Sequence, residues 1–105
     1  MKESDWKIFK QIKEDAIELF CQKALEEFEE IIKRKHGKAQ ETYTLLYRII
    51  ENRDKQMALI FDGHSRSKAQ LQLLAMRGEG LADENLLNNL SEEFLKATDP
   101  KRVNW

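Results

Sequence analysis

No glycine or proline interrupts this chain between Asp5 and His36. Apolar residues recur at helical spacing throughout the stretch, which predicts one long amphipathic helix. The apolar arc contains Trp6, Phe9, Ile12, Ala16, Ile17, Phe20, Cys21, Ala24, Leu25, Phe28, Ile31 and Ile32. These positions cover more of the helix surface than one neighbouring helix can bury, so we expect two neighbours. The pattern favours packing and self-association over chemistry.

Both ends of this helix carry the expected signals. Ser4 or Asp5 can cap the first free amide groups, and basic residues before Gly37 complement the helix dipole. Gly37 can adopt the left-handed conformation that closes a helix. A second helix is expected to begin at residues 39–42. Because the linker is short, the two helices should pack antiparallel as a hairpin.

The second helix has one apolar stripe, which comprises Tyr43, Leu46, Ile50, Met57 and Phe61, with Ile49 and Ile60 beside it. The stripe stays in phase through His64, Leu71 and Ala75. Gly63 is therefore either a break or a glycine inside one helix, where it costs roughly 1 kcal/mol. The phase favours a continuous or merely kinked helix to about Arg77.

Gly78-Glu79-Gly80 is the clearest break in the chain. Beyond it we predict two short helices, one within residues 83–90 and one that Ser91 caps. Asp99-Pro100 should end regular structure. The sequence therefore predicts an all-α fold, a long antiparallel helix hairpin with two short C-terminal helices packed across it as in a bundle.

The composition is that of a small single-domain protein. Of its 105 residues 41% are hydrophobic, and we assign residues 1–98 to one helical domain and residues 99–105 to a C-terminal tail. The chain has 18 Lys and Arg and 19 Asp and Glu, so its formal net charge is -1. A charge this small gives no overall electric field that would attract nucleic acid or anionic lipid. With no long apolar run and no apolar core of a secretory signal, we expect a cytoplasmic protein.

No motif for catalysis, metal binding or cofactor binding stands out. Helical metal centres often pair Glu and His three residues apart, but Lys33 and Phe61 stand three residues before the two histidines. Cys21 has no base or second cysteine to activate it, so we expect an inert, buried thiol. Gly78-Glu79-Gly80 lacks the lysine and hydroxyl of a phosphate-binding loop. We predict no cofactor and no enzymatic activity.

A basic cluster marks the expected tip of the hairpin. It consists of Lys33, Arg34, Lys35, His36 and Lys38. Leu73-Leu74-Ala75 and residues 80–87 also resemble the first part of a helix-turn-helix of the response-regulator type. The segment in the position of the recognition helix begins Ser91-Glu92-Glu93-Phe94, too short and acidic for a groove lined by phosphates. A nucleic-acid-associated regulator that uses the basic tip is an alternative function, although we do not expect nucleic acid as the partner.

Polar residues inside the apolar stripes are the remaining candidates. Arg53 falls between apolar residues of the second helix, and His64 lies on the same line further along. Glu27 projects between Phe9 and Phe20 of the first helix. Since an isolated buried charge is costly, Arg53 should either reach water at a seam or pair with Glu27. A site around Glu27, Arg53 and His64 that binds a small ligand or catalyses a reaction is a further alternative.

These patterns together predict a small, non-catalytic interaction or regulatory module. We expect a homodimer, because two hairpins can form a four-helix bundle that covers both sides of the first helix. The pattern predicts no membrane partner and does not identify a protein partner.

Overall fold

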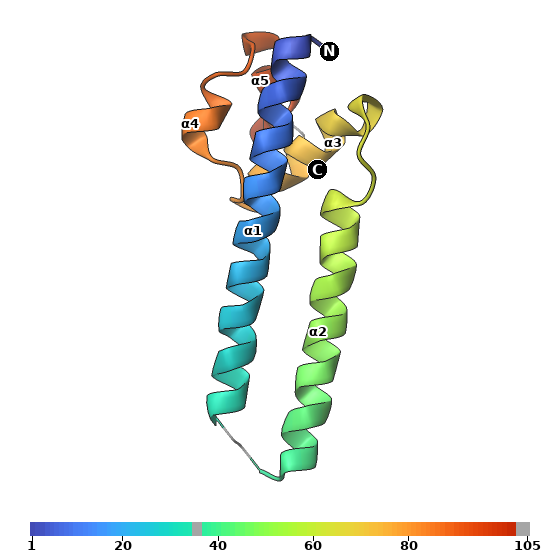
Figure 1. Ribbon diagram of the computed structural model, residues 1–105, viewed down its shortest axis with the longest axis vertical. Coiled ribbons are helices and arrows are strands. Elements are labelled where there is room, and N and C mark those ends of the chain that lie inside the picture. Colours follow the sequence, from blue (N-terminus) through green and yellow to red (C-terminus); the bar gives the residue numbers. More distant parts are fainter. Residues whose placement is uncertain (35–36, 103–105) are drawn as a thin grey trace.

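The computed structural model describes residues 1–34 and 37–102 of the chain. In these ranges the protein is all-α, as the sequence predicts, and contains no strand. The elements are α1 (Glu3–Arg34), α2 (Ala39–Phe61), α3 (Arg66–Gly78), α4 (Glu84–Leu87), α5 (Glu92–Ala97) and a 3-10 turn, η1 (Pro100–Arg102). The molecule measures 54 × 27 × 23 Å, and α1 and α2 lie side by side along its length (Figure 1). No helix in the described part of the chain is long and apolar enough to cross a bilayer.

The helices α1 and α2 form the predicted antiparallel hairpin. Gly37 has a left-handed φ of 72° after the end of α1, the conformation expected of a glycine that terminates a helix. At the other end of α2, Phe20 and Phe61 pack edge to face, with their ring centroids 6.0 Å apart. This aromatic contact marks the level at which the hairpin meets the rest of the fold.

The hydrophobic core lies at the end of the hairpin opposite its tip. There α3 contacts both α1 and α2, and α4 contacts α1. The buried core comprises Phe9, Ile12, Ala16, Phe61, Ala69, Leu73, Met76, Leu81, Leu87 and Leu90. Within α1, Ala24 is the one buried apolar residue beyond Ala16, and within α2 Phe61 is the one buried residue. The tip half of the hairpin therefore consists of two helices without a core around them.

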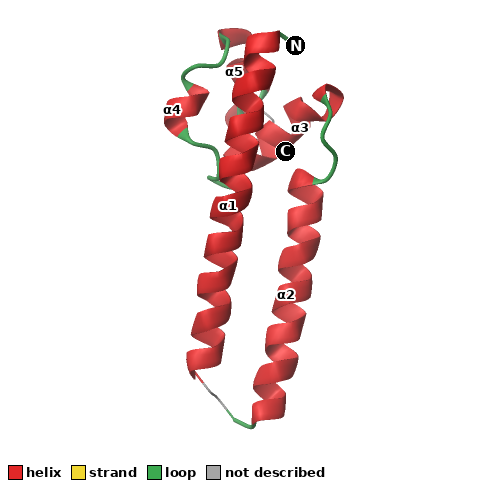
Figure 2. Ribbon diagram, in the orientation of Figure 1, coloured by secondary structure: helices red, strands yellow, loops and turns green. Residues whose placement is uncertain are grey.

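The expectation of one continuous or kinked helix to Arg77 is wrong. α2 ends at Phe61 and α3 begins at Arg66, and the loop between them turns the chain across the end of the hairpin (Figure 2). Gly63 has a φ of 85°, which an L side chain adopts only with strain. Apolar residues stay in phase across this loop, so the periodicity alone does not reveal it.

Side chains from other elements hold this loop in place. The Lys13 Nζ donates a hydrogen bond to the carbonyl of Gly63 at 2.7 Å. The Gln72 Nε2 donates to the carbonyls of Asp62 and Gly63, each at 2.9 Å. In a continuous helix, backbone amides would donate hydrogen bonds to these carbonyls. Here the side chains of Lys13 and Gln72, which are distant in the sequence, donate them instead.

Both short C-terminal helices lie where the sequence predicts them. The Asp83 carboxylate accepts hydrogen bonds from two backbone amides at the start of α4, and the Ser91 hydroxyl accepts one at the start of α5. Regular structure continues beyond its predicted end at Asp99-Pro100, because η1 packs on α3. Residues 103–105, which include Trp105, lie outside the described part of the chain.

Candidate functional site

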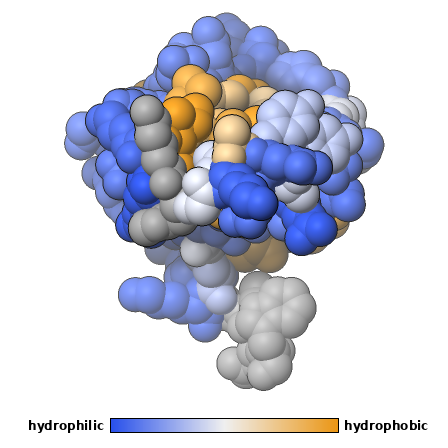
Figure 3. Space-filling view, turned by 90° about the horizontal axis from the view of Figure 1, so that it is seen from below, coloured by the Kyte–Doolittle hydropathy of each residue, from blue (hydrophilic) through white to orange (hydrophobic). Residues whose placement is uncertain are grey.

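The tip half of the hairpin exposes a continuous apolar surface on one side. We call it the hairpin face and define it by Cys21, Leu25, Phe28 and Ile32 of α1 and Tyr43, Tyr47, Ile50 and Met57 of α2. Within each helix these residues recur at intervals of three, four or seven positions, so they share one side. Seen from the tip end, hydrophobic residues are open to view beside a hydrophilic rim (Figure 3).

A groove of about 310 Å³ runs between the two helices on this side. Leu25 and Phe28 of α1 line it together with Ile50 and Met57 of α2. Cys21 also lines the groove and is half-buried, rather than buried as the sequence suggests. The groove is therefore an apolar depression at the centre of the hairpin face.

Large side chains of the hairpin face lie open to solvent in the single chain. Leu25 is 65% exposed, Tyr43 73% and Ile50 43%. Scattered apolar residues are ordinary on protein surfaces, whereas a contiguous patch is typical of an interaction site. Burial of apolar area stabilises by about 25 cal/mol per Å², so covering several such side chains would contribute several kcal/mol.

A second hollow along the hairpin, of about 240 Å³, contains an ion pair. The Arg53 Nη2 donates to both carboxylate oxygens of Glu27, at 2.9 and 3.0 Å, and its Nη1 donates to the Gln56 Oε1 at 3.2 Å. The side chains of Arg53 and Glu27 remain 33% and 38% exposed. The structure thus brings together two of the three predicted polar residues, at a seam that water reaches.

His64 does not join this pair. Its ring packs against Trp6, with the centroids 5.1 Å apart, near the start of α1. At about 1.5 Å per residue, Trp6 and Glu27 are separated by roughly 30 Å along the helix. The proposed three-residue polar site therefore does not form. Trp6 instead lies among cations, with the Lys10 Nζ 5.8 Å and the Arg66 guanidinium carbon 5.5 Å from its ring centroid.

The basic cluster is described only in part. Lys33, Arg34 and Lys38 belong to the described residues, whereas Lys35 and His36 lie outside them. The three described side chains are exposed, and the Lys33 Nζ pairs with the Glu29 Oε1 at 2.7 Å. Lys33 and Arg34 lie in the last turn of α1, and Lys38 stands immediately before α2.

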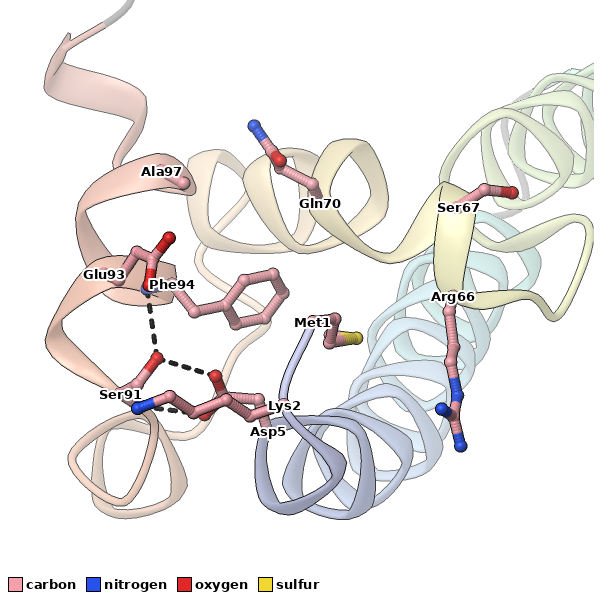
Figure 4. Close-up of a pocket in the computed structure, with 10 residues that line it drawn as sticks. All are labelled: Met1, Lys2, Asp5, Arg66, Ser67, Gln70, Ser91, Glu93, Phe94 and Ala97. Atoms are coloured by element: carbon pink, nitrogen blue, oxygen red, sulfur yellow. Dashed lines mark hydrogen bonds between the residues drawn. The ribbon is translucent and has the colours of Figure 1, made fainter.

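A larger pocket, of about 590 Å³, lies at the core end between α1, α3 and α5 (Figure 4). Asp5, which is 3% exposed, accepts hydrogen bonds there from the Ser91 amide at 2.8 Å and the Ser91 hydroxyl at 2.6 Å. The Ser91 Oγ in turn accepts from the Phe94 amide at 3.2 Å. Instead of capping its own helix, as the sequence suggests, Asp5 ties α1 to the start of α5.

Lys13 is a buried polar residue that the apolar pattern does not single out. It is 6% exposed, and its Nζ holds the carbonyl of Gly63. Burial lowers the pKa of Lys13 from its ordinary value of 10.5, Asp62 opposes this change, and Lys68 adds to it. Its spacing, four residues after Phe9 and three before Ala16, places it on the side of these buried residues and is the signal that could have found it. Lys13 and Asp5 both join segments of the fold that lie far apart in the sequence.

Within residues 1–34 and 37–102, no group of three or more His, Cys, Asp and Glu side chains is placed to hold a metal ion. The hairpin face is an apolar part of the described surface that the fold leaves uncovered. Comparisons with protein-family models, with curated protein sequences and with solved structures find no match for this chain.

Proposed function

We propose that this protein is a small, non-catalytic interaction module that self-associates through the hairpin face. The observation that carries the proposal is the row of exposed apolar side chains along the coreless half of the hairpin, such as Leu25, Tyr43 and Ile50. Contact of such an apolar surface with water is unfavourable, and a protein partner that covers the surface removes this contact. Two hairpins stacked face to face would form a four-helix bundle and give the tip half of α1, which packs on α2 alone, a second neighbour.

A second copy of the chain is the occupant we propose. A two-fold interface requires that one surface be complementary to itself, and we propose that aliphatic and aromatic side chains beside the groove of one copy pack into the groove of the other. Phe28, Tyr43 and Tyr47 supply the aromatic residues in which interface centres are enriched. A cytoplasmic site of action is part of the proposal, because a free thiol at the groove, Cys21, stays reduced there.

Light scattering coupled to size-exclusion chromatography over a dilution series tests the proposal. We expect twice the 12.4 kDa mass of the chain at high concentration and a fall toward the monomer mass on dilution. Leu25→Glu places a charge in the groove and should abolish the dimer. Leu59→Glu is the matched control, because Leu59 is 86% exposed and projects from another side of α2 than Met57.

Two results would overturn the proposal. One is a monomer mass at every concentration. The other is a Leu25→Glu variant that dimerises as tightly as the Leu59→Glu control. Because Leu25 is 65% exposed in the single chain, its replacement should leave the fold intact. Equal helical circular dichroism of the two variants checks this point.

A further inference from the structure

Building on the proposed self-association, we infer that the ionised carboxylate of Asp54 weakens the dimer at neutral pH, so that acid strengthens it. Asp54 follows Ile50 by four residues and precedes Met57 by three, which places it on the side of α2 that carries the hairpin face. It lines the groove, and among the groove residues in the described part of the chain it is the only carboxylate. A second copy that covers the hairpin face therefore also covers a negative charge.

The side chain of Asp54 has no partner in the single chain. It is exposed, and within residues 1–34 and 37–102 it forms neither a hydrogen bond nor an ion pair. Arg53 also lines the groove, but its guanidinium donates to Glu27 and Gln56, which line the second hollow. The charge of Arg53 is thus already paired, and Asp54 depends on water for its hydration.

The ionisable groups of α1 on this side of the hairpin do not balance Asp54 either. Across the groove, α1 contributes the thiol of Cys21. Glu18 precedes Leu25 by seven residues and Glu29 follows it by four, so both carboxylates lie toward the hairpin face. Glu29 forms an exposed ion pair with Lys33 of its own helix. The surroundings of the groove are therefore acidic on α1 as well.

A second copy brings no cation to Asp54 from the residues that define the hairpin face. Those residues are aliphatic or aromatic apart from one thiol, and the hydroxyls of Tyr43 and Tyr47 are the strongest hydrogen-bond donors among them. Glu51, three residues before Asp54 on α2, adds a further carboxylate beside the groove. Removing water from an ionised carboxylate that meets no cation is unfavourable, and each dimer contains two such carboxylates.

Protonation of Asp54 removes this unfavourable charge. The ionised form is favoured in the monomer, where water hydrates it, and the neutral form is favoured in the dimer, where the second copy covers it. Two monomers therefore take up protons when they form the dimer, and by linkage a fall in pH lowers the dimer Kd. Repulsion between the flanking carboxylates of the two copies has the same sign, because it also weakens when they are protonated.

Sedimentation equilibrium at about pH 7.5 and about pH 5 tests this role of Asp54. Asp54→Asn keeps the size of the side chain and removes its charge, so at about pH 7.5 it should lower the dimer Kd by about tenfold. The Kd of the unsubstituted protein should fall by about fivefold between the two pH values, and Asp54→Asn should lose most of this dependence. Because Asp54 is exposed in the single chain, its replacement should leave the fold intact.

Glu41→Gln is the matched control. Glu41 is an exposed carboxylate of the same helix, but it lines a hollow with Lys38 and Arg48 on another side of α2. Its replacement should change the Kd by less than about twofold. If Asp54→Asn and Glu41→Gln dimerised with the same Kd and the same pH dependence, the role of Asp54 would be overturned and self-association would stand. Monomers of all three proteins at every concentration and pH would overturn both.

Discussion

The ion pair of Glu27 and Arg53 lies at a seam that water reaches. One guanidinium nitrogen serves both carboxylate oxygens, so the pair lacks the two parallel bonds of the strongest arginine–carboxylate geometry. Both side chains keep about a third of their exposure, 33% and 38%. The pair should therefore resemble a surface salt bridge, worth up to about 1 kcal/mol, more than a buried one.

A double-mutant cycle tests this view. Glu27→Leu and Arg53→Met should show a coupling energy of about 0.5–1 kcal/mol in denaturant unfolding. The double variant should be close to the unsubstituted protein in stability, because both charges leave together. A coupling energy above about 3 kcal/mol would contradict the open seam, since only desolvated pairs reach that value.

Asp5 shows the opposite case of a carboxylate that the fold encloses. Asp5→Ala removes both hydrogen bonds to Ser91 and leaves the backbone amide of Ser91 without an acceptor. The free energy of unfolding should therefore fall by about 2–3 kcal/mol. Asp5→Asn keeps one acceptor oxygen and should lose less. Glu26→Ala, at an exposed position of α1, is the control and should change stability by less than about 0.5 kcal/mol. Equal stabilities of Asp5→Ala and Glu26→Ala would show that the link between α1 and α5 is not needed.

At the scale of elements, the loop between α2 and α3 decides where the second helix ends. Gly63 has a φ of 85°, and an added Cβ would also crowd the side chain of Lys68. Gly63→Ala should therefore destabilise the protein by about 1–2 kcal/mol. Gly78→Ala is the matched control, because Gly78 lies in α3 and its added Cβ would meet only ordinary contact distances.

Thermal or denaturant unfolding of the two variants separates these effects. Gly78→Ala should be neutral or stabilising by about 0.5–1 kcal/mol, as expected for alanine in a helix. If Gly63→Ala were equally harmless, the left-handed turn would not be what separates α2 from α3.

Helical periodicity and local end signals suffice to predict the hairpin and the two short C-terminal helices. Gly37 and Ser91 act on the residues next to them, so their effect can be read from the sequence. The break after Phe61 cannot be read in this way, because the apolar stripe stays in phase across it. Its loop is held by Lys13 and Gln72, which tertiary structure alone brings to the same carbonyls.

The candidate site is predictable to a similar extent. The wide apolar arc of the first helix predicts more than one neighbour, and the α1 residues of the hairpin face belong to the part of that arc that the fold leaves open. The sequence does not predict the position of His64, because a helical projection continued through Gly63 aligns His64 with Arg53. In the structure the chain turns at Gly63, and His64 packs on Trp6.

At the scale of the whole molecule, the protein has a packed end and an open end. The core gathers residues from α1, α3, α4, the connecting segments and the last residue of α2, Phe61, whereas the tip half of the hairpin has α1 and α2 alone. A helix pair without further burial is marginally stable, because helices depend on tertiary packing more than on intrinsic propensity. We propose that a second copy supplies the missing packing at the hairpin face.

Cys21 reports on this claim without any substitution, because it is the single cysteine of the chain and lines the groove. The measurement is the rate at which a small uncharged reagent, in large excess, modifies this thiol at increasing protein concentrations. The rate in denaturant gives the reference for a fully exposed thiol. We expect the rate of modification in the native protein to fall as the protein passes from monomer to dimer, because the second copy covers the groove. A native rate that stays constant across that transition would contradict it.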